Sequence, residues 1–360
     1  MSKRIAIVGG GYAGAELAKA LQDKADVTLI EQQSHFVHTP AMIRALVTPE
    51  LLDQALIPYD KLLTRGEVIQ ARVTGVDGDG VTLEDGRRVD ADYVVVATGS
   101  DNATPFRPNG NGIATLRAEN ARVHGLLKQA QTVAIVGAGA VGSELAGEIA
   151  HFMPEKDVTL ISATPSLFPD MPKALGKGLL AKLQAANVTM KLGARVENLE
   201  HLSAPYAGTL QLDTGEAVTA DLIIPVIGSR AVSGLLQDLQ GVKMSGEQRI
   251  KNDQWMRPTA MPNVFAVGDV ADIGDGMTIV AISRQLPWLK KMLIAVVGGA
   301  KVEDVKPYKP WSKAPILLPL GPQKGQSFLS LFTAGDFLTR VIKGKDLFLT
   351  KTHKLFNTKS

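Results

Sequence analysis

The chain has 360 residues, of which 45% are hydrophobic and 21% charged, which is the composition of an ordinary globular protein long enough for two domains. It contains no cysteine, which excludes disulfides, thiolate nucleophiles, thiolate-bound iron–sulfur clusters and paired redox thiols. Its formal net charge of +3 is too small to indicate nucleic-acid binding, so we expect no nucleic-acid partner, and no motif indicates a metal site.

The start of the chain and its apolar segments bear on where the protein works. An apolar stretch begins at Ile5, which leaves no room for a signal peptide, and Ser2 stands where N-myristoylation requires glycine. No apolar run reaches the roughly 18 residues that a spanning helix needs. We therefore expect a cytoplasmic protein and leave open a peripheral attachment to a membrane surface.

A glycine-rich turn follows the first predicted strand. Residues 5–8 are apolar, residues 9–14 read Gly-Gly-Gly-Tyr-Ala-Gly, and a helical pattern comes next. A second apolar strand, residues 27–30, ends at Glu31. This strand–turn–helix–strand context makes the G-x-G-x-x-G pattern typical of a dinucleotide site, whereas the pattern alone would also fit a structural turn.

The positions in this turn have separate tasks in such a site. Gly9 permits the tight turn, Gly11 allows the backbone to approach a pyrophosphate, and Gly14 lets the helix pack closely on the strand. Free N–H groups at the helix start attract the phosphates, and the acid can accept hydrogen bonds from ribose hydroxyls. The predicted contacts of this first site are Gly9, Gly10, Gly11, Tyr12, Ala13, Gly14 and Glu31.

The same pattern recurs in the middle of the chain. Residues 133–136 are apolar, residues 137–142 read Gly-Ala-Gly-Ala-Val-Gly, and the next apolar strand ends at Ser162. The repeat extends further, because residues 83–100 match residues 212–229. We therefore predict an α/β protein with two doubly wound, Rossmann-like dinucleotide-binding domains in tandem.

A further buried strand, residues 263–268, ends at Asp269 before a helical stretch near 277–297. An acid at the carboxyl end of a strand lies where doubly wound sheets bind ligands. The strand fits the first domain better than the second, so we expect the second domain to be inserted into the first. The expected layout is a first domain formed by residues 1–122 and 245–300, an inserted domain formed by 123–244, and a C-terminal α+β segment formed by 301–360.

The order of these motifs resembles that of the pyridine-nucleotide-dependent flavoprotein reductases over the first 300 residues. The resemblance implies that the first domain binds FAD and that the inserted domain binds NADH or NADPH. It adds Thr98, Gly99 and Asp269 to the FAD contacts, with the acid near the ribitol and pyrophosphate. The implied NAD(P)H contacts are Gly137, Gly139, Gly142 and Ser162.

Within this superfamily the chain most resembles the ferroptosis-suppressor and apoptosis-inducing-factor-like oxidoreductases, which are related to the type II NADH:quinone dehydrogenases. The segments that carry this resemblance are residues 36–44, 154–161, 308–310 and 343–348. It implies that Arg44 and the backbone of Val73 contact FAD. It also implies that Glu144 lies near the nicotinamide and that Lys343 and Phe348 border an acceptor channel. For Glu144 the alternative is a first-turn acid favoured by the helix dipole.

Two departures from the family pattern bear on the reaction. Ser162 stands where an NAD-preferring site carries an acid, but no Arg or Lys follows before Lys173, so the choice between NADH and NADPH stays open. Without cysteine, electrons cannot pass through paired thiols, so an acceptor has to reach the flavin itself. Together with these departures, the resemblance implies an enzyme, an FAD-dependent NAD(P)H:quinone oxidoreductase. Reduction of a ferredoxin- or rubredoxin-type partner and a non-catalytic signalling or binding role are the alternatives.

The last residues of the chain interleave apolar and basic side chains. Phe348, Leu349, Leu355 and Phe356 alternate with Lys343, Lys345, Lys351 and Lys354. One interpretation is peripheral membrane contact, with the apolar side chains inward and the lysines toward anionic lipid. The other is a basic terminal element packed on its own domain.

Overall fold

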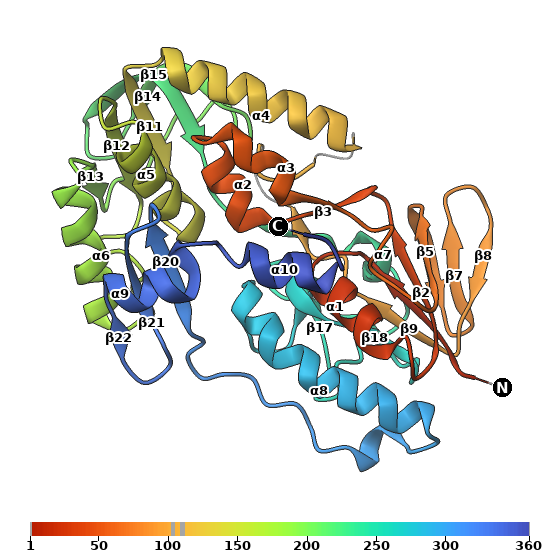
Figure 1. Ribbon diagram of the computed structural model, residues 1–360. Helices are drawn as coiled ribbons and strands as arrows, with labels where there is room; N and C mark the ends of the chain where they lie inside the picture. Colours follow the sequence, from red (N-terminus) through yellow and green to blue (C-terminus); the bar gives the residue numbers. More distant parts are fainter. Residues whose placement is uncertain (1, 102–104, 109–111, 360) are drawn as a thin grey trace.

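The computed structural model of the protein describes residues 2–101, 105–108 and 112–359. Figure 1 shows two α/β units beside each other, with the C-terminal segment returning to contact both. Each unit is built on a five-stranded sheet. Among the described residues, no helix is long and apolar enough to cross a membrane.

The first sheet is parallel, with the strand order β18–β9–β1–β2–β5. Its strands are β1 (Arg4–Val8), β2 (Asp26–Glu31), β5 (Glu67–Gln70), β9 (Tyr93–Val96) and β18 (Val264–Ala266). Ile5 and Ile7 are buried toward one face and Ala6 and Val8 toward the other, as expected for a parallel sheet covered on both sides. Because β18 pairs with β9, the chain leaves this sheet and returns to it, which confirms the predicted fold class with an inserted second unit.

Helices, short strands and a small antiparallel sheet complete the first unit. Helix α1 (Tyr12–Leu21) packs against α8 (Ile279–Val297), and the antiparallel sheet of β6 (Val73–Asp77), β7 (Gly80–Leu83) and β8 (Arg88–Asp90) adjoins β9. The remaining elements are β3 (His35–Val37), α2 (Thr39–Ala45), η1 (Pro49–Leu51), α3 (Leu52–Ala55), β4 (Leu56–Pro58), β10 (Ser100–Asp101), β16 (Arg230–Ala231), α7 (Gly234–Gln237), β17 (Ile250–Lys251), η2 (Gly268–Val270) and β19 (Ala271–Asp272).

The second sheet has the order β13–β12–β11–β15–β14, with only β14 antiparallel to its neighbour. Its strands are β11 (Thr132–Val136), β12 (Asp157–Ser162), β13 (Thr189–Leu192), β14 (Tyr206–Gln211) and β15 (Ala217–Pro225). The helices of this unit are α4 (Gly112–Gln129), α5 (Ala140–Phe152) and α6 (Lys173–Ala185). The expected boundary between residues 122 and 123 falls inside α4.

The C-terminal segment forms a third layer on the second unit. After η3 (Val302–Asp304) an extended connection leads to an antiparallel sheet, in which β20 (Ile316–Leu320) packs on α5 and β21 (Lys324–Phe328) on α6. The last elements are β22 (Thr333–Ala334), α9 (Asp336–Thr339), the π-helix η4 (Arg340–Gly344) and α10 (Leu349–Leu355).

The end of the chain is part of the protein core, which corrects the first interpretation of the tail. Phe356 is fully buried, with its ring centroid 4.9 Å from that of Phe36 and 5.7 Å from that of Tyr59. Leu349 is also buried, and Leu355 packs against the same core as Phe356. Because Leu349 and Phe356 are buried inside the protein, they do not face a membrane, and the structure favours a terminal element packed on its own protein.

Candidate functional site

The first glycine turn has the geometry of a dinucleotide-binding loop. Gly9 has a φ of +99°, and a Cβ there would lie 2.5 Å from Ala97 O, so the tight turn requires glycine. At Gly14 a Cβ would lie 1.8 Å from Gly9 O, which shows how closely the helix meets the turn. At Gly11 a Cβ would project into open space, so this position leaves room for a ligand.

Glu31 supports this turn from the end of β2. One carboxylate oxygen accepts a hydrogen bond from Gly10 N at 2.6 Å and the other from Gln33 N at 2.8 Å. Burial raises the pKa of Glu31, while these backbone bonds lower it by less. Tyr59 OH donates to Gly10 O at 2.8 Å, so Gly10 is held from both sides.

A cavity of about 630 Å³, called here the first cavity, opens beyond this turn. It has the volume of a cofactor site, and two arginines that sequence analysis missed, Arg72 and Arg107, line it with positive charge. Their irregular segments carry no motif that could have pointed to them. The predicted residues that line it are Gly9, Gly11, Tyr12, Ala13, Glu31, Val73, Thr98, Gly99 and Asp269. The cavity size, the open position at Gly11 and the basic lining fit a dinucleotide such as FAD.

Asp269 lies where the first cavity meets a second one. Its Oδ2 accepts a hydrogen bond from Ser100 Oγ at 2.7 Å. The preceding Gly268 has a φ of +79°, and its N–H donates to the side chain of Gln285 in α8 at 3.0 Å. The turn that presents the Asp269 carboxylate is therefore fixed by neighbours on both sides.

The second glycine turn repeats the first. Gly137 has a φ of +114°, and a Cβ at Gly142 would lie 1.9 Å from Gly137 O, while a Cβ at Gly139 would meet open space. Ser162 is buried at the end of β12, and its hydroxyl lies 2.9 Å from the Thr164 hydroxyl. The hydroxyl of Ser162 also accepts a hydrogen bond from Thr164 N at 3.3 Å.

A second cavity of about 290 Å³, called here the junction cavity, lies where all parts of the chain meet. Tyr12 and Asp269 line it from the first unit, Gly139 and Glu144 from the second, and Phe348 from the C-terminal segment. Tyr12, Ser100, Arg107, Asp269 and Ile282 line both cavities, so the two cavities adjoin.

Two of the predicted catalytic residues form an ion pair in the junction cavity. Lys343 Nζ lies 2.6 Å from Glu144 Oε1 and 3.1 Å from Leu317 O. Both side chains are largely buried. The exposed fraction is 5% for Glu144 and 11% for Lys343. Burial raises the pKa of Glu144, and the charges of Lys343 and Arg44 offset only part of that increase.

Arg44, which the resemblance places among the FAD contacts, forms an ion pair with an acid of the second unit. Its guanidinium forms two hydrogen bonds of 2.9 Å with the carboxylate of Glu148, one turn beyond Glu144 in α5. Arg44 lines neither cavity. The pair is buried and joins α2 of the first unit to α5 of the second. The sequence could not reveal this partner, because the contact depends on how α2 lies against α5.

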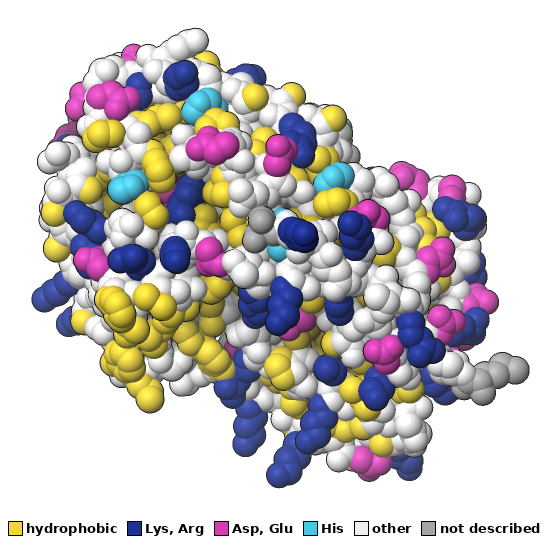
Figure 2. Space-filling view, viewed as in Figure 1, with side chains coloured by type: hydrophobic (Ala, Val, Ile, Leu, Met, Phe, Trp, Pro, Cys, Tyr) yellow, Lys and Arg dark blue, Asp and Glu magenta, His cyan; other side chains and the backbone are white. Residues whose placement is uncertain are grey.

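An exposed apolar patch adjoins the junction cavity on the outside of the protein. Figure 2 shows hydrophobic side chains gathered over the corner where Figure 1 labels β22 and α9. The patch consists of Leu331, Phe332, Phe337, Val341 and Ile342, whose exposed fractions are 92%, 55%, 73%, 60% and 37%. It shares the π-helix η4 with Lys343, so one short element connects the patch to the cavity.

Comparisons with known proteins agree with this architecture. A family model for pyridine nucleotide-disulphide oxidoreductases matches residues 3–287. Apoptosis-inducing factor homolog B of Dictyostelium discoideum is 31% identical, over 97% of this chain and 95% of the relative. Ferroptosis suppressor protein 1 of Homo sapiens is 27% identical, over 97% and 95%.

Solved structures share the fold over almost the whole chain. The sulfide:quinone oxidoreductase of Aquifex aeolicus has a TM-score of 0.80 at 16% identity, covering 99% of this chain and 92% of that chain. NDH2 of Plasmodium falciparum in complex with NADH has a TM-score of 0.76 at 13% identity, covering 98% and 97%. At these identities the likeness concerns the fold.

Proposed function

The chain belongs to the pyridine nucleotide-disulphide oxidoreductase family, and we propose that it is an FAD-dependent NAD(P)H:quinone oxidoreductase. Family membership indicates FAD as the cofactor and NAD(P)H as the co-substrate. When bound, FAD takes up two electrons as hydride from NAD(P)H and passes them to an acceptor. The acceptor that we propose is a quinone.

The junction cavity is the observation that carries this proposal. It brings the N-terminus of α1, the second glycine turn and the C-terminal segment to one place, with Asp269 on the border to the first cavity. A cofactor held along the first cavity by the Gly9–Gly14 turn, Glu31 and Asp269 would have one end at the junction. An NAD(P)H molecule whose pyrophosphate is held at Gly139 would approach from the other unit.

The composition of the chain and of the cavity favours a small apolar acceptor. The chain has no cysteine, so it lacks the thiols through which disulfide-reducing members of such families work. Phe106, Ile316 and Phe348 give the junction cavity an apolar lining beside the Glu144–Lys343 pair. A quinone ring suits apolar walls, and its carbonyl oxygens suit a charged hydrogen-bond donor such as the Lys343 ammonium.

Glu144 and Lys343 are suited to handle protons in this reaction. Reduction of a quinone to a quinol by two electrons requires two protons. Burial raises the pKa of the Glu144 carboxyl, which favours its taking up a proton, and the adjacent Lys343 ammonium can donate a hydrogen bond. We therefore assign Glu144 and Lys343 the roles of proton carrier and acceptor-orienting group.

The apolar patch supports a peripheral contact with a lipid surface. This contact would be made by the patch and not by the apolar side chains of residues 348–356. Val341 and Ile342 are exposed, while Lys343 on the same π-helix lines the junction cavity. The exposed Arg340 and Lys345 flank them, which suits anionic lipid headgroups. A quinone with a long isoprenoid tail could then reach the cavity from the lipid.

Turnover with an acceptor panel tests the proposed function. The purified protein should oxidise NADH or NADPH rapidly with a short-chain ubiquinone or a naphthoquinone. Turnover only with a ferredoxin or rubredoxin would instead support reduction of an iron–sulfur partner. FAD bound without turnover toward any acceptor would support a binding or signalling role.

A further inference from the structure

His38 is a buried residue that connects three segments of the chain. It directly precedes α2 and is 1% exposed. Its Nε2 lies 2.6 Å from Leu347 O, and its Nδ1 lies 3.0 Å from Tyr12 OH. Tyr12 lines both cavities, and Leu347 directly precedes Phe348, which lines the junction cavity. His38 therefore lies between the start of α1 and the C-terminal wall of that cavity.

The hydrogen bonds of His38 determine where its proton lies. A carbonyl oxygen can only accept, so Nε2 carries the hydrogen that is donated to Leu347 O. In the neutral ring Nδ1 is then an acceptor. Thr352 Oγ1 also lies near Nδ1, at 3.3 Å, but it donates its hydrogen to Phe348 O at 2.9 Å, so Tyr12 OH is the donor to Nδ1. Burial lowers the pKa of His38 to about 4, which keeps the ring neutral.

The segment that His38 holds has an unfavourable backbone conformation. Leu347 has a φ of +54° and Phe348 a φ of +67°, a region that large side chains rarely adopt. Phe348 N donates to Asp346 Oδ1 at 3.0 Å, and Leu347 N donates to Lys343 O at 2.7 Å. Such a turn persists only where surrounding contacts fix it. The hydrogen bond from His38 Nε2 to the Leu347 carbonyl is one such contact.

We propose that His38 is a positioning residue that fixes the Leu347–Phe348 turn and thereby the wall of the junction cavity against which the acceptor binds. The inference rests on the proposed quinone reductase function. It assigns His38 no contact with the acceptor, because Phe348 lines the junction cavity and His38 does not. The expected signature is a change in acceptor affinity, without a change in FAD binding or in reduction by NADH.

A pair of variants separates the hydrogen bond from the volume of the side chain. Gln and Met have similar length, but only the Gln amide can donate to Leu347 O. His38→Met should raise the KM and the dissociation constant for a short-chain ubiquinone about tenfold, as for loss of one buried hydrogen bond. His38→Gln should stay within about threefold of the unmodified protein, since it restores that bond.

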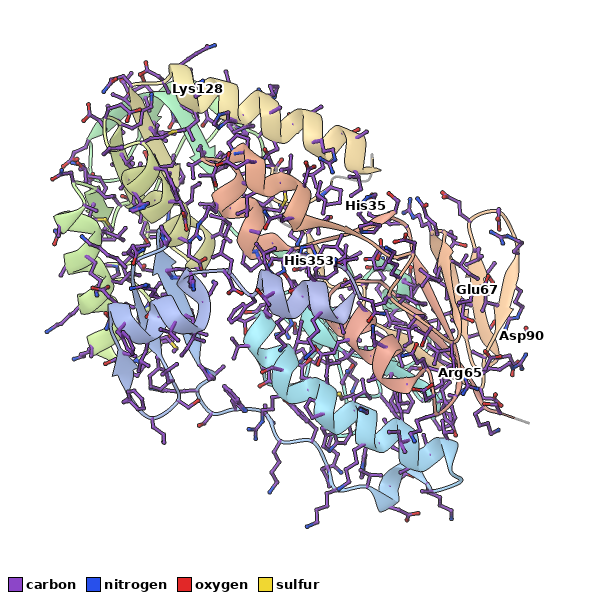
Figure 3. All side chains as sticks on the ribbon, viewed as in Figure 1. His35, Arg65, Glu67, Asp90, Lys128 and His353 are labelled. Atoms are coloured by element: carbon purple, nitrogen blue, oxygen red, sulfur yellow. The ribbon has the colours of Figure 1, made fainter. Side chains whose placement is uncertain are left out.

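The matched control is His353, a second buried histidine in the same segment. It lies on α10 (Figure 3) and hydrogen-bonds Gln54 O at 3.0 Å and the Thr358 hydroxyl at 2.8 Å. Neither partner lines the junction cavity. His353→Met should therefore leave the affinity for the quinone unchanged.

The experiment measures KM, kcat, FAD content, the rate of flavin reduction by NADH, and quinone affinity by quenching of flavin fluorescence. An unchanged quinone affinity in His38→Met overturns the inference, as does an equal loss in His38→Gln or in His353→Met. Loss of FAD in His38→Met would also overturn it, because His38 would then act on the cofactor. If His38→Met does not fold, His38→Asn, whose amide is too short to reach Leu347, takes its place under the same criteria. Failure of the unmodified protein to reduce quinones would contradict the proposed function itself.

Discussion

The Lys343 ammonium lies 2.6 Å from the Glu144 carboxylate, and the two residues are 199 positions apart in the chain. The contact joins the C-terminal π-helix to α5 of the second unit inside the junction cavity. Both side chains are largely buried, with exposed fractions of 5% for Glu144 and 11% for Lys343. The pair is therefore a structural link as well as the proposed chemical centre.

Removing one member of this pair should be more harmful than removing both. Lys343→Met leaves the Glu144 carboxylate buried without its partner and should lower the free energy of unfolding by about 3–5 kcal/mol. The double variant with Glu144→Gln should recover much of that loss. Urea unfolding of the FAD-loaded proteins measures both values, with the exposed Lys345→Met as control. Equal losses in the single and double variants would show that the two charges do not interact.

Asp269 should contribute to FAD retention, because it presents a carboxylate on the border between the cavities. Asp269→Asn should weaken FAD binding about tenfold, the effect of losing one charge-assisted hydrogen bond. Equilibrium dialysis of the apoprotein with FAD measures this change. Asp272→Asn, in β19 and outside both cavities, is the control. Equal FAD affinity in the two variants would remove Asp269 from the cofactor site.

The low pKa of His38 makes stability depend on pH in the acidic range. Burial lowers this pKa from 6.5 to about 4, so between these values the unfolded chain binds a proton that the folded protein does not. Stability should therefore fall as pH decreases from about 6.5 to about 4, by up to about 3 kcal/mol from this group. Urea unfolding at several pH values should show a shallower decline in His38→Gln. Identical slopes would mean that groups other than His38 govern this range.

The apolar patch should determine binding to lipid. Phe337→Ser combined with Val341→Ser removes two of its most exposed side chains and should reduce sedimentation with anionic liposomes severalfold. Stability should change little, since surface substitutions usually stay within about 0.5 kcal/mol. Leu202→Ser, at a 54% exposed position in the second unit, is the control. Unchanged sedimentation of the double variant would place the lipid contact elsewhere or exclude it.

Ser162 should influence the choice of nucleotide. Ser162→Asp adds an acceptor for the ribose 2′-hydroxyl and repels a 2′-phosphate, so the ratio of kcat/KM for NADH over NADPH should rise about tenfold. Steady-state kinetics with both nucleotides measures the ratio, and Ser166→Asp is the control for added charge nearby. An unchanged ratio would mean that discrimination depends on residues outside β12.

The parts of the fold that depend on local geometry could be predicted from sequence. Gly9 and Gly137 each adopt a positive φ at the end of a strand. Gly14 and Gly142 follow about five residues later in the chain, where the helix packs closely against the same turn. Such constraints are visible in the residue pattern. The assignment of β18 to the first domain could also be predicted, because its apolar run ends in an acid, as expected at the ligand-binding edge of such a sheet.

Contacts between distant segments could not be predicted in the same way. Nothing in the sequence shows that Arg44 faces Glu148 or that His38 reaches Leu347, since both contacts depend on how α2 lies against other elements. The tail shows the same limit. An amphipathic basic pattern fits a membrane surface and a protein core equally well, and Phe356 proves to lie in the core, while the exposed apolar side chains belong to α9, η4 and the preceding loop.

Anaerobic stopped-flow spectroscopy tests the central claim most directly. The protein with FAD bound is first reduced by one equivalent of NADH or NADPH and then mixed with a short-chain ubiquinone. We predict that the flavin absorbance is lost on reduction and returns within the turnover time on mixing with the quinone. Flavin that the nucleotide does not reduce, or reduced flavin that the quinone does not reoxidise, would contradict the assignment as an NAD(P)H:quinone oxidoreductase.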